Sequence, residues 1–180
     1  MKISIFHFFL LVISKCFAQN IPPFVYDGDD RIVYEQEMDC ENLSKEQMYN
    51  QALTWIADTF ESSKYVIEKQ AETSGSIIGS AKRSFSFPSG VTTAYYEVNF
   101  YFQLDVKDQQ LTYRLADLTA IRSGNTTETP IEDIVEYAKG SKSSVGFPKD
   151  YAVALLSAGN EVIEEMLGSL ADSVCPDADL

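Results

Sequence analysis

Histidine is nearly absent from this chain of 180 residues: the only one is His7, close to the N-terminus. Ser-His-Asp and Cys-His catalysis both need an imidazole to carry the proton, and the commonest catalytic zinc sites use histidine ligands. If the first residues are removed as a signal peptide, as argued below, the mature chain has no histidine at all. The sequence therefore excludes these classes of enzyme.

Cysteine is also scarce, and only Cys40 and Cys175 lie outside the N-terminal segment. Two cysteines so far apart are too few for a cysteine-rich metal site. In an exported protein they can form a disulfide that ties the start of the domain to its end. The alternative is two free thiols in flexible segments, and the sequence does not decide between them.

Positive charge is low, because 14 basic residues stand against 27 acidic ones and give a net charge of −13. Loss of residues 1–18 removes two lysines and no acid, so the mature charge is −15. Such a surface repels nucleic-acid phosphates and anionic lipid headgroups. We expect no nucleic-acid partner, and no stable membrane insertion after signal cleavage.

A long hydrophobic run occupies the N-terminus. Lys2 is followed by the almost wholly apolar stretch Ile3–Ile13 and by small residues at Cys16 and Ala18, which is the pattern of a secretory signal peptide. We predict cleavage after Ala18 and a periplasmic or secreted protein. An uncleaved anchor fits less well, since a membrane span needs about 20 apolar residues. A lipoprotein signal through Cys16 is disfavoured by Lys15 directly before it.

The remaining 162 residues suit a single domain, which we place at 31–175. An extended lead-in, residues 19–30, precedes it. Asp27, Asp29 and Asp30 in this lead-in match no EF-hand calcium loop. We expect a solvated turn there, and we expect no metal site and no cofactor.

The domain begins with a strand and a helix. Residues 31–38 alternate apolar and polar side chains with the period of a strand. Ser44 and Gln47 then form a capping box at the start of a helix. The apolar stripe of this helix consists of Tyr49, Ala52, Leu53, Trp55, Ile56 and Phe60. Because a helix buries such a stripe to be stable, we expect Trp55 in the core.

Strands fill the middle of the chain. Residues 64–71 and 76–85 predict a hairpin around Gly75, which permits a positive φ, and the Phe-Pro-Ser-Gly stretch at 87–90 is expected to break the sheet. Residues 94–106 then alternate strictly. One face of this strand is apolar and the other polar, as in a sheet that is buried on one side.

The register of the next strand can be derived from its side chains. Val106 opposes Leu111 if the chain turns at 107–110, and then every apolar residue of both strands shares one face. The apolar pairs are Leu104–Tyr113 and Phe102–Leu115, and the polar pairs are Gln103–Arg114 and Asp105–Thr112. This register fails at Asp117, so we predict a bulge near Ala116 that returns Leu118 to the core.

Two helices complete the domain. Thr129 and Glu132 predict a second capping box, with Pro130 at the first helical position and Gly140 at the end. The last helix is expected from about Lys149 to Ser173.

These elements predict an α+β fold: a β-α-β4-α antiparallel sheet with helices on one face, plus an additional C-terminal helix. The most distinctive residues are Tyr49, Ala52, Trp55, Ile56, Ala57, Phe60, Gly75–Gly79, Tyr113 and Arg114. Through them the chain resembles a domain of unknown function with a TATA-binding-protein-like fold, found in exported proteins of gram-negative bacteria. The resemblance covers about residues 31–138. It implies the fold and the export, and it implies no catalytic role.

Two functions are compatible with these residues. We favour a non-catalytic binding module that contacts a protein, peptide or glycan through the polar face of the sheet. Its candidate contact residues are Tyr95, Glu97, Asn99, Tyr101, Gln103 and Arg114. The alternative is a carboxylate-dependent hydrolase such as a glycosidase, with Glu97 and Asp117 as the first residues to test. An ordinary solvated sheet face would present the same side chains.

Overall fold

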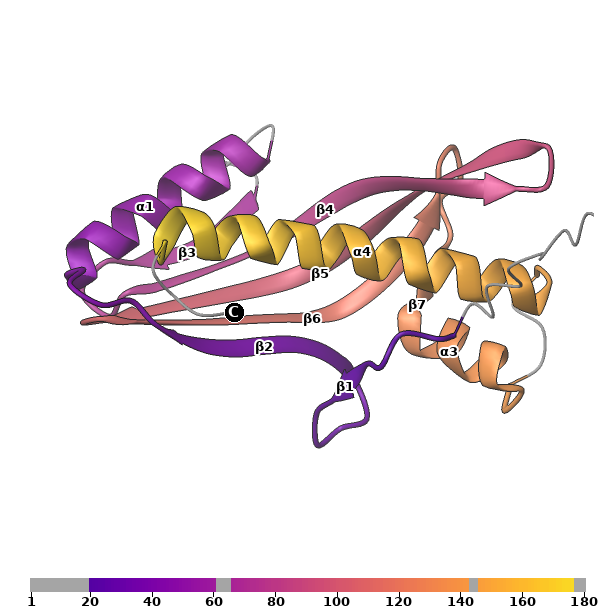
Figure 1. The fold of residues 1–180 in the computed structure, drawn as a ribbon, viewed down its shortest axis with the longest axis horizontal. Coiled ribbons are helices and arrows are strands. Elements are labelled where there is room, and N and C mark those ends of the chain that lie inside the picture. Colours follow the sequence, from indigo (N-terminus) through magenta and orange to yellow (C-terminus); the bar gives the residue numbers. More distant parts are fainter. Residues whose placement is uncertain (1–19, 61–65, 143–145, 177–180) are drawn as a thin grey trace, which may run out of the picture.

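The computed structural model describes residues 20–60, 66–142 and 146–176, so the expected signal peptide lies outside the described residues. In this part of the chain, an antiparallel sheet of seven strands carries three helices (Figure 1). The strands are β1 (Val25–Tyr26), β2 (Ile32–Asp39), β3 (Ile67–Ala71), β4 (Ser76–Ser89), β5 (Thr92–Lys107), β6 (Gln110–Arg122) and β7 (Glu128–Pro130). The helices are α1 (Lys45–Thr59), α3 (Ile131–Lys139) and α4 (Lys149–Val174).

The strand order across the sheet is β1-β2-β6-β5-β4-β3, and β7 pairs with β6. This confirms the α+β class with its antiparallel sheet and additional C-terminal helix. The sheet also contains two short strands, β1 and β7, that no periodicity in the sequence predicts. Strands of two or three residues are too short to show a period.

The derived register of β5 and β6 is confirmed. Val106 pairs with Leu111 and Phe102 with Leu115, and the pairing shifts between Asn99 and Tyr101 as a bulge requires. The extra residue lies at Asp117, whose φ is 54°. Beyond the bulge, Leu118 and Ala120 are both buried on the apolar face, as predicted.

The two faces of the sheet have different environments. Along β5 the even-numbered residues from Ala94 to Val106 are buried, whereas the odd-numbered ones are exposed or half-buried. Helices α1 and α4 lie over the buried face, with α4 running along the length of the sheet (Figure 1). Trp55 of α1 is buried as expected, and its Nε1 donates to Ser169 Oγ of α4 at 3.0 Å. We call the opposite, helix-free side the exposed face.

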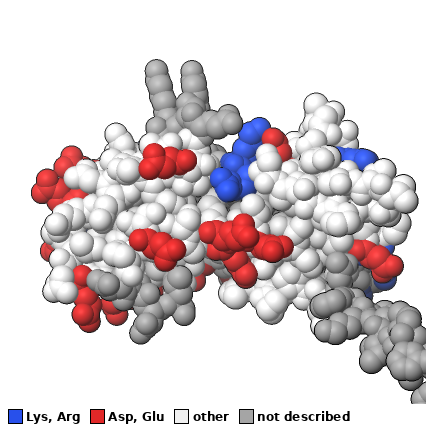
Figure 2. All heavy atoms as spheres, turned by 45° about the horizontal axis from the view of Figure 1, so that its top comes forward, with Lys and Arg blue, Asp and Glu red and all other residues white. Residues whose placement is uncertain are grey.

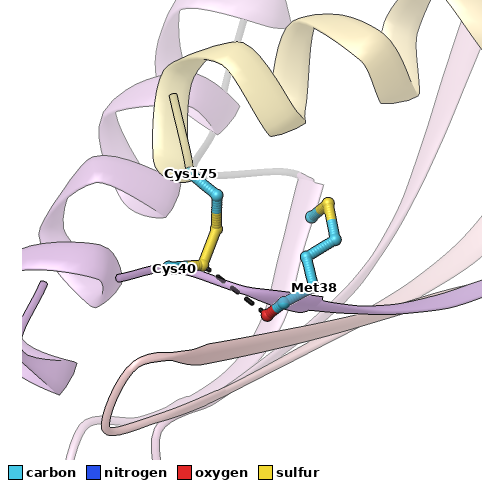
Figure 3. Close-up of a disulfide and its surroundings, with 3 residues drawn as sticks. All are labelled: Met38, Cys40 and Cys175. Carbon is cyan, nitrogen blue, oxygen red and sulfur yellow. Dashed lines mark hydrogen bonds between the residues drawn. A yellow bond between two sulfur atoms is a disulfide. The ribbon is translucent and has the colours of Figure 1, made fainter. Parts of the chain in front are cut away.

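A disulfide joins the end of β2 to the end of α4. It links Cys40, just after β2, to Cys175, just after α4, across 135 residues of sequence (Figure 3). Both cysteines are buried, and Cys40 Sγ lies 3.7 Å from the carbonyl oxygen of Met38. The sequence left open whether these cysteines form a disulfide or two free thiols, and the structure contains the disulfide.

The expected break at 87–90 is wrong, because β4 continues to Ser89 and forms a hairpin with β5. Gly90, with φ of 61°, occupies the first position of the two-residue turn that Ser89 and Thr92 close. In such a hairpin the closing pair is hydrogen-bonded, so the residue before it directs its backbone nitrogen away from the partner strand. Pro88 occupies this position. Its lack of an N–H therefore removes no hydrogen bond between β4 and β5.

The second predicted capping box is also wrong. Thr129 lies in β7, Pro130 is the N-cap of α3 instead of its first residue, and no side chain caps this helix. Glu132 reaches across to β2, where its carboxylate accepts a hydrogen bond from the Ile32 N–H at 2.7 Å. A partner distant in sequence has replaced the local one. Gly140 ends the helix as predicted, with φ of 88°.

Three tyrosines carry their hydroxyl groups beneath α4. Tyr34 donates to Asn160 Oδ1 at 2.7 Å, and Tyr113 donates to Gln36 Oε1 at 3.0 Å. Burial raises the pKa of both, and the nearby charge of Glu164 adds to the effect. Burial also raises the pKa of Tyr96, whose hydroxyl accepts from Tyr151.

We therefore expect the protein to lose stability above about pH 10. An unfolded tyrosine ionises near that pH, whereas Tyr34 and Tyr96 hold their protons in the fold. Their contribution to the free energy of unfolding is full below about pH 10. It falls as the pH rises toward the pKa values that these tyrosines have in the folded protein. Urea unfolding at successive pH values should give this slope, and absorbance at 295 nm should show part of the tyrosinate signal appearing only on unfolding. The slope should weaken in Tyr34→Phe; an unchanged slope would contradict the assignment.

Candidate functional site

The outer edge of β4 is largely unpaired among the described residues. On this side β3 pairs only with Ser76–Gly79, while β4 continues to Ser89. Four exposed side chains follow this free edge on the exposed face: Ser80, Lys82, Ser84 and Ser86. The described residues thus leave most of the strand without a neighbour on one side.

A groove of about 1120 Å³ follows this edge. We call it the β4 groove. Its lining from β4 is Ser80, Ala81, Lys82, Arg83 and Ser84; from the exposed face of β5, β6 and β7, Glu97, Asn99, Tyr101, Asp117, Thr119 and Glu128; and from the core side, Thr59, Phe60, Val66 and Phe100. The groove therefore contacts both faces of β4. It is much larger than the cavity of about 240 Å³ beside Tyr96 and Phe147.

The carboxylates in the β4 groove have fixed partners. Glu97 pairs with Lys82 at 3.0 Å across β5 and β4. Glu128 accepts from Thr119 Oγ1 at 3.0 Å and from Asn99 Nδ2 at 3.3 Å. These contacts position hydrogen-bonding groups along the floor of the groove.

Asp117 enters the groove because of the β-bulge. The extra residue turns its side chain out of the sheet, where 59% of it is exposed and it pairs with Arg31 at 3.1 Å. Bulges commonly redirect a side chain toward a site in this way. The sequence located the bulge but gave Asp117 no place in the binding surface.

Arg83 is a basic residue whose guanidinium is only partly satisfied by the described residues. It lies on the helix-covered side of β4, and its Nη1 donates to the Thr59 carbonyl at the end of α1, at 3.3 Å. Its Nε is buried and has no hydrogen-bond partner among residues 20–60, 66–142 and 146–176. No carboxylate among the described residues pairs with it, although the chain has nearly twice as many acidic as basic residues.

The sequence contains a signal for Arg83. Four alternate side chains of β4 point toward the helix-covered face: Ala81, Arg83, Phe85 and Phe87. Of these four, Arg83 alone is charged. A charged side chain in an apolar phase marks a site that needs a partner.

The structure brings together three of the six predicted contact residues. Glu97, Asn99 and Tyr101 line the β4 groove, and the described residues give the Tyr101 hydroxyl no hydrogen-bond partner. Tyr95 lies nearer the β4–β5 turn and is 60% exposed. Gln103 is outside the groove, where its Nε2 donates to Asp105 Oδ2 at 2.5 Å.

Arg114, the sixth predicted residue, is held within the protein. Its guanidinium pairs with Asp27 at 2.8 Å and also with Glu35. Asp27 accepts the backbone N–H groups of Asp29 and Arg31 at 3.0 Å, which forms a tight turn. The Arg31 N–H is the strongest of the contacts that hold the pKa of the Asp27 carboxyl below its usual range. The turn at 28–30 is exposed, as expected. Only the Asp27 side chain departs from the expectation, because it is 13% exposed and anchors the lead-in to the sheet.

Charge is unevenly distributed on the surface. Figure 2 shows acidic side chains at several places on one side of the molecule, and lysine or arginine side chains mainly in one compact group. The described residues contain no group of three or more cysteine or acidic side chains arranged to hold a metal ion. None of their helices has the length and apolarity to cross a membrane.

Comparison with known proteins identifies the fold family. Residues 34–120 match the family described as "Domain of unknown function (DUF4468) with TBP-like fold". This segment is similar to the DUF4468 family. No curated protein matches the sequence.

Two solved structures support the assignment of the DUF4468 fold. One is a TBP-like protein from Parabacteroides distasonis, with a TM-score of 0.64 and 15% identity; the match covers 83% of this chain and 95% of that one. The other is a DUF4468 family protein from Bacteroides ovatus, with a TM-score of 0.60 and 16% identity, covering 83% and 92%. At such identity the likeness concerns the fold, and function must be argued from the site.

Proposed function

We propose that this protein is an exported binding module without catalytic activity. It is periplasmic or secreted, and it binds a peptide, a glycan or another protein in the β4 groove and on the adjoining exposed face. The observation that carries the proposal is that this groove is lined by Glu97, Asn99 and Tyr101, three residues of the polar face that the alternation along β5 predicts.

The composition of the groove suits binding. Tyr101 offers a half-buried ring, and its hydroxyl has no hydrogen-bond partner in the described part of the chain. Tyrosine is enriched in binding surfaces because it combines contact area with a hydrogen-bonding group. Asn99 and Thr119 add polar groups held in place by Glu128. The net charge of −15 on the mature chain disfavours nucleic acid as the ligand.

Export is supported by two features of the chain. The N-terminal residues have the order of a cleavable signal peptide. A buried disulfide joins the two ends of the domain, and structural disulfides form mainly in oxidising compartments outside the cytoplasm.

Replacing Tyr101 by alanine tests the groove. The purified mature protein is first screened on peptide and glycan arrays, and the ligand found is titrated by calorimetry. We expect Tyr101→Ala to weaken binding about 30-fold, the effect of losing one central aromatic contact of about 2 kcal/mol. Tyr26→Ala is the control, because Tyr26 is exposed on β1 and lies outside the groove. Equal affinity of the Tyr101 variant and the wild type would refute the proposed site.

A further inference from the structure

The backbone groups along the β4 edge have a definite direction. In an antiparallel pair, residues that exchange hydrogen bonds alternate with residues that exchange none. The closing pair Ser89–Thr92 is hydrogen-bonded, so the odd-numbered residues of β4 form the backbone hydrogen bonds to β5. The Val106 N–H donates to the Gly75 carbonyl at 2.8 Å, which agrees with this phase. The even-numbered residues Ser80, Lys82, Ser84 and Ser86 therefore direct their N–H and C=O groups outward.

These outward groups have no backbone partner within the described residues. Strand β3 ends its pairing at Gly79, and no turn or loop bonds to the backbone of Ser80–Ser86. A row of unpaired N–H and C=O groups is a template for another strand. Peptide recognition by strand addition uses such a row, with affinity from main-chain hydrogen bonds and specificity from side-chain pockets.

The side chains from Lys82 to Ser86 leave the approach to the edge open, whereas the Ser80 hydroxyl donates to Glu68 of β3 at 2.5 Å. Three of the four outward-facing residues are serines, which are small. Lysine often protects an edge strand, but the Lys82 ammonium is held over the exposed face by Glu97, at 3.0 Å. Pro88 has no N–H to offer, so it marks the end of the usable edge.

Arg83 defines the chemistry of a partner. Toward an added antiparallel strand it occupies a non-hydrogen-bonded position, where opposing side chains come closest. The residue opposite would place its side chain on the same face as the guanidinium. Within the part of the chain that the structure describes, Arg83 has no carboxylate partner and its buried Nε has no hydrogen-bond partner. An aspartate or glutamate on the ligand would supply a charge-assisted hydrogen bond.

We propose that the β4 edge binds an extended peptide by antiparallel strand addition along Ser80–Ser86, with an acidic side chain of the peptide against Arg83. This inference rests on the proposed function and specifies its ligand class and binding mode. The flanking lining of the β4 groove, including Phe60 on one face and Tyr101 on the other, would contact alternate side chains of the peptide.

Amide hydrogen exchange measured by NMR on the disulfide-bonded mature protein tests the geometry. The probe is a capped peptide of alternating threonine and valine with a central glutamate. We expect exchange at the N–H groups of Ser80, Lys82, Ser84 and Ser86 to slow by about tenfold or more, with little change at Ala81 and the other odd-numbered residues. The same peptide N-methylated at its pairing positions should give no protection. Equal protection by both peptides would overturn strand addition.

The acidic contact has its own test. A peptide with glutamine in place of glutamate should bind about tenfold more weakly, the effect of losing one charge-assisted hydrogen bond. Arg83→Gln should abolish this preference, whereas Lys82→Gln, which removes a neighbouring charge from the other face, should keep it. A preference that survives in Arg83→Gln would overturn the role of Arg83.

The remaining outcomes separate this inference from the proposed function. Chemical shift changes at Asn99 and Tyr101 without protection of the edge amides would overturn strand addition and leave the groove as a binding site. No response to the probe at any residue would overturn strand addition, while the Tyr101 experiment would still decide the proposed function. Protection that appears without peptide and rises with protein concentration would show a second copy on the edge, and would overturn the peptide proposal.

Discussion

Loss of the disulfide between Cys40 and Cys175 should lower the free energy of unfolding by about 4 to 5 kcal/mol. The bond closes a loop of 135 residues, and in the chain-entropy model a loop of this length restricts the unfolded chain strongly. The total stability of a domain is typically about 5 to 15 kcal/mol, so the bond accounts for a large share of it. Urea unfolding of the oxidised protein and of the Cys40→Ala/Cys175→Ala double variant measures the difference.

Reduced wild-type protein is the matched control for this prediction. It has the same sequence as the oxidised protein, so the difference between the two forms reports the bond alone. The difference between the reduced form and the double variant reports the lost packing of two buried sulfur atoms. If reduction changes the free energy of unfolding by less than about 1 kcal/mol, the loop-closure account is wrong, since it requires at least a few kcal/mol for so long a loop.

The central sheet was predictable because its signals are local and periodic. The alternation in 94–106 assigns each side chain to a face, and the turn after it leaves one register in which the apolar residues of both strands agree. Asp117 violates that register, and the violation located the bulge. The capping box of Ser44 and Gln47 is likewise confirmed, because both partners lie within one turn of the helix.

The errors arise where a distant partner replaces a local one. Thr129 and Glu132 have the spacing of a capping box, but Glu132 instead bonds the backbone of Ile32, one hundred residues earlier in the chain. Pro88 reads as a breaker in isolation, yet it is tolerated because the edge of β4 is free at that point. Neither the Glu132–Ile32 hydrogen bond nor the free edge at Pro88 can be predicted from the spacing of residues in the sequence. Both depend on which strands become neighbours.

Only part of the candidate site could be predicted from the sequence, because the rest depends on which strands become neighbours. Alternation along β5 is enough to place Glu97, Asn99 and Tyr101 on the exposed face. Arg83 enters the site only because β3 is shorter than β4, which leaves the neighbouring backbone unpaired. Arg114 was expected to contact a ligand, but the lead-in folds back and supplies Asp27 to it. Strand lengths and the path of a lead-in are properties of the assembled sheet.

Gly79→Ala should destabilise the protein by about 3 kcal/mol, near the upper end of the usual cost of overpacking. A Cβ added at Gly79 would lie 2.0 Å from the carbonyl oxygen of Val66 and 2.8 Å from the ring of Phe102. The carbonyl belongs to the backbone that leads into β3, so it cannot rotate away as a side chain would. Relief of the clash requires β3 to move from β4. Urea unfolding of the variant gives the loss directly.

Gly28→Ala is the control, since a Cβ there meets nothing within 4 Å, and its effect should stay within about 0.5 kcal/mol. The result also bears on the β4 edge, because Gly79 is the last residue of β4 that β3 covers. If the clash displaces β3, the N–H of Ile78 should lose protection from hydrogen exchange, whereas the pairing of β4 with β5 should keep its own. If the free energy of unfolding falls by less than about 1 kcal/mol and the Ile78 N–H stays protected, β3 accommodates the added Cβ without leaving the sheet. That result would contradict the prediction from the close contact at Gly79.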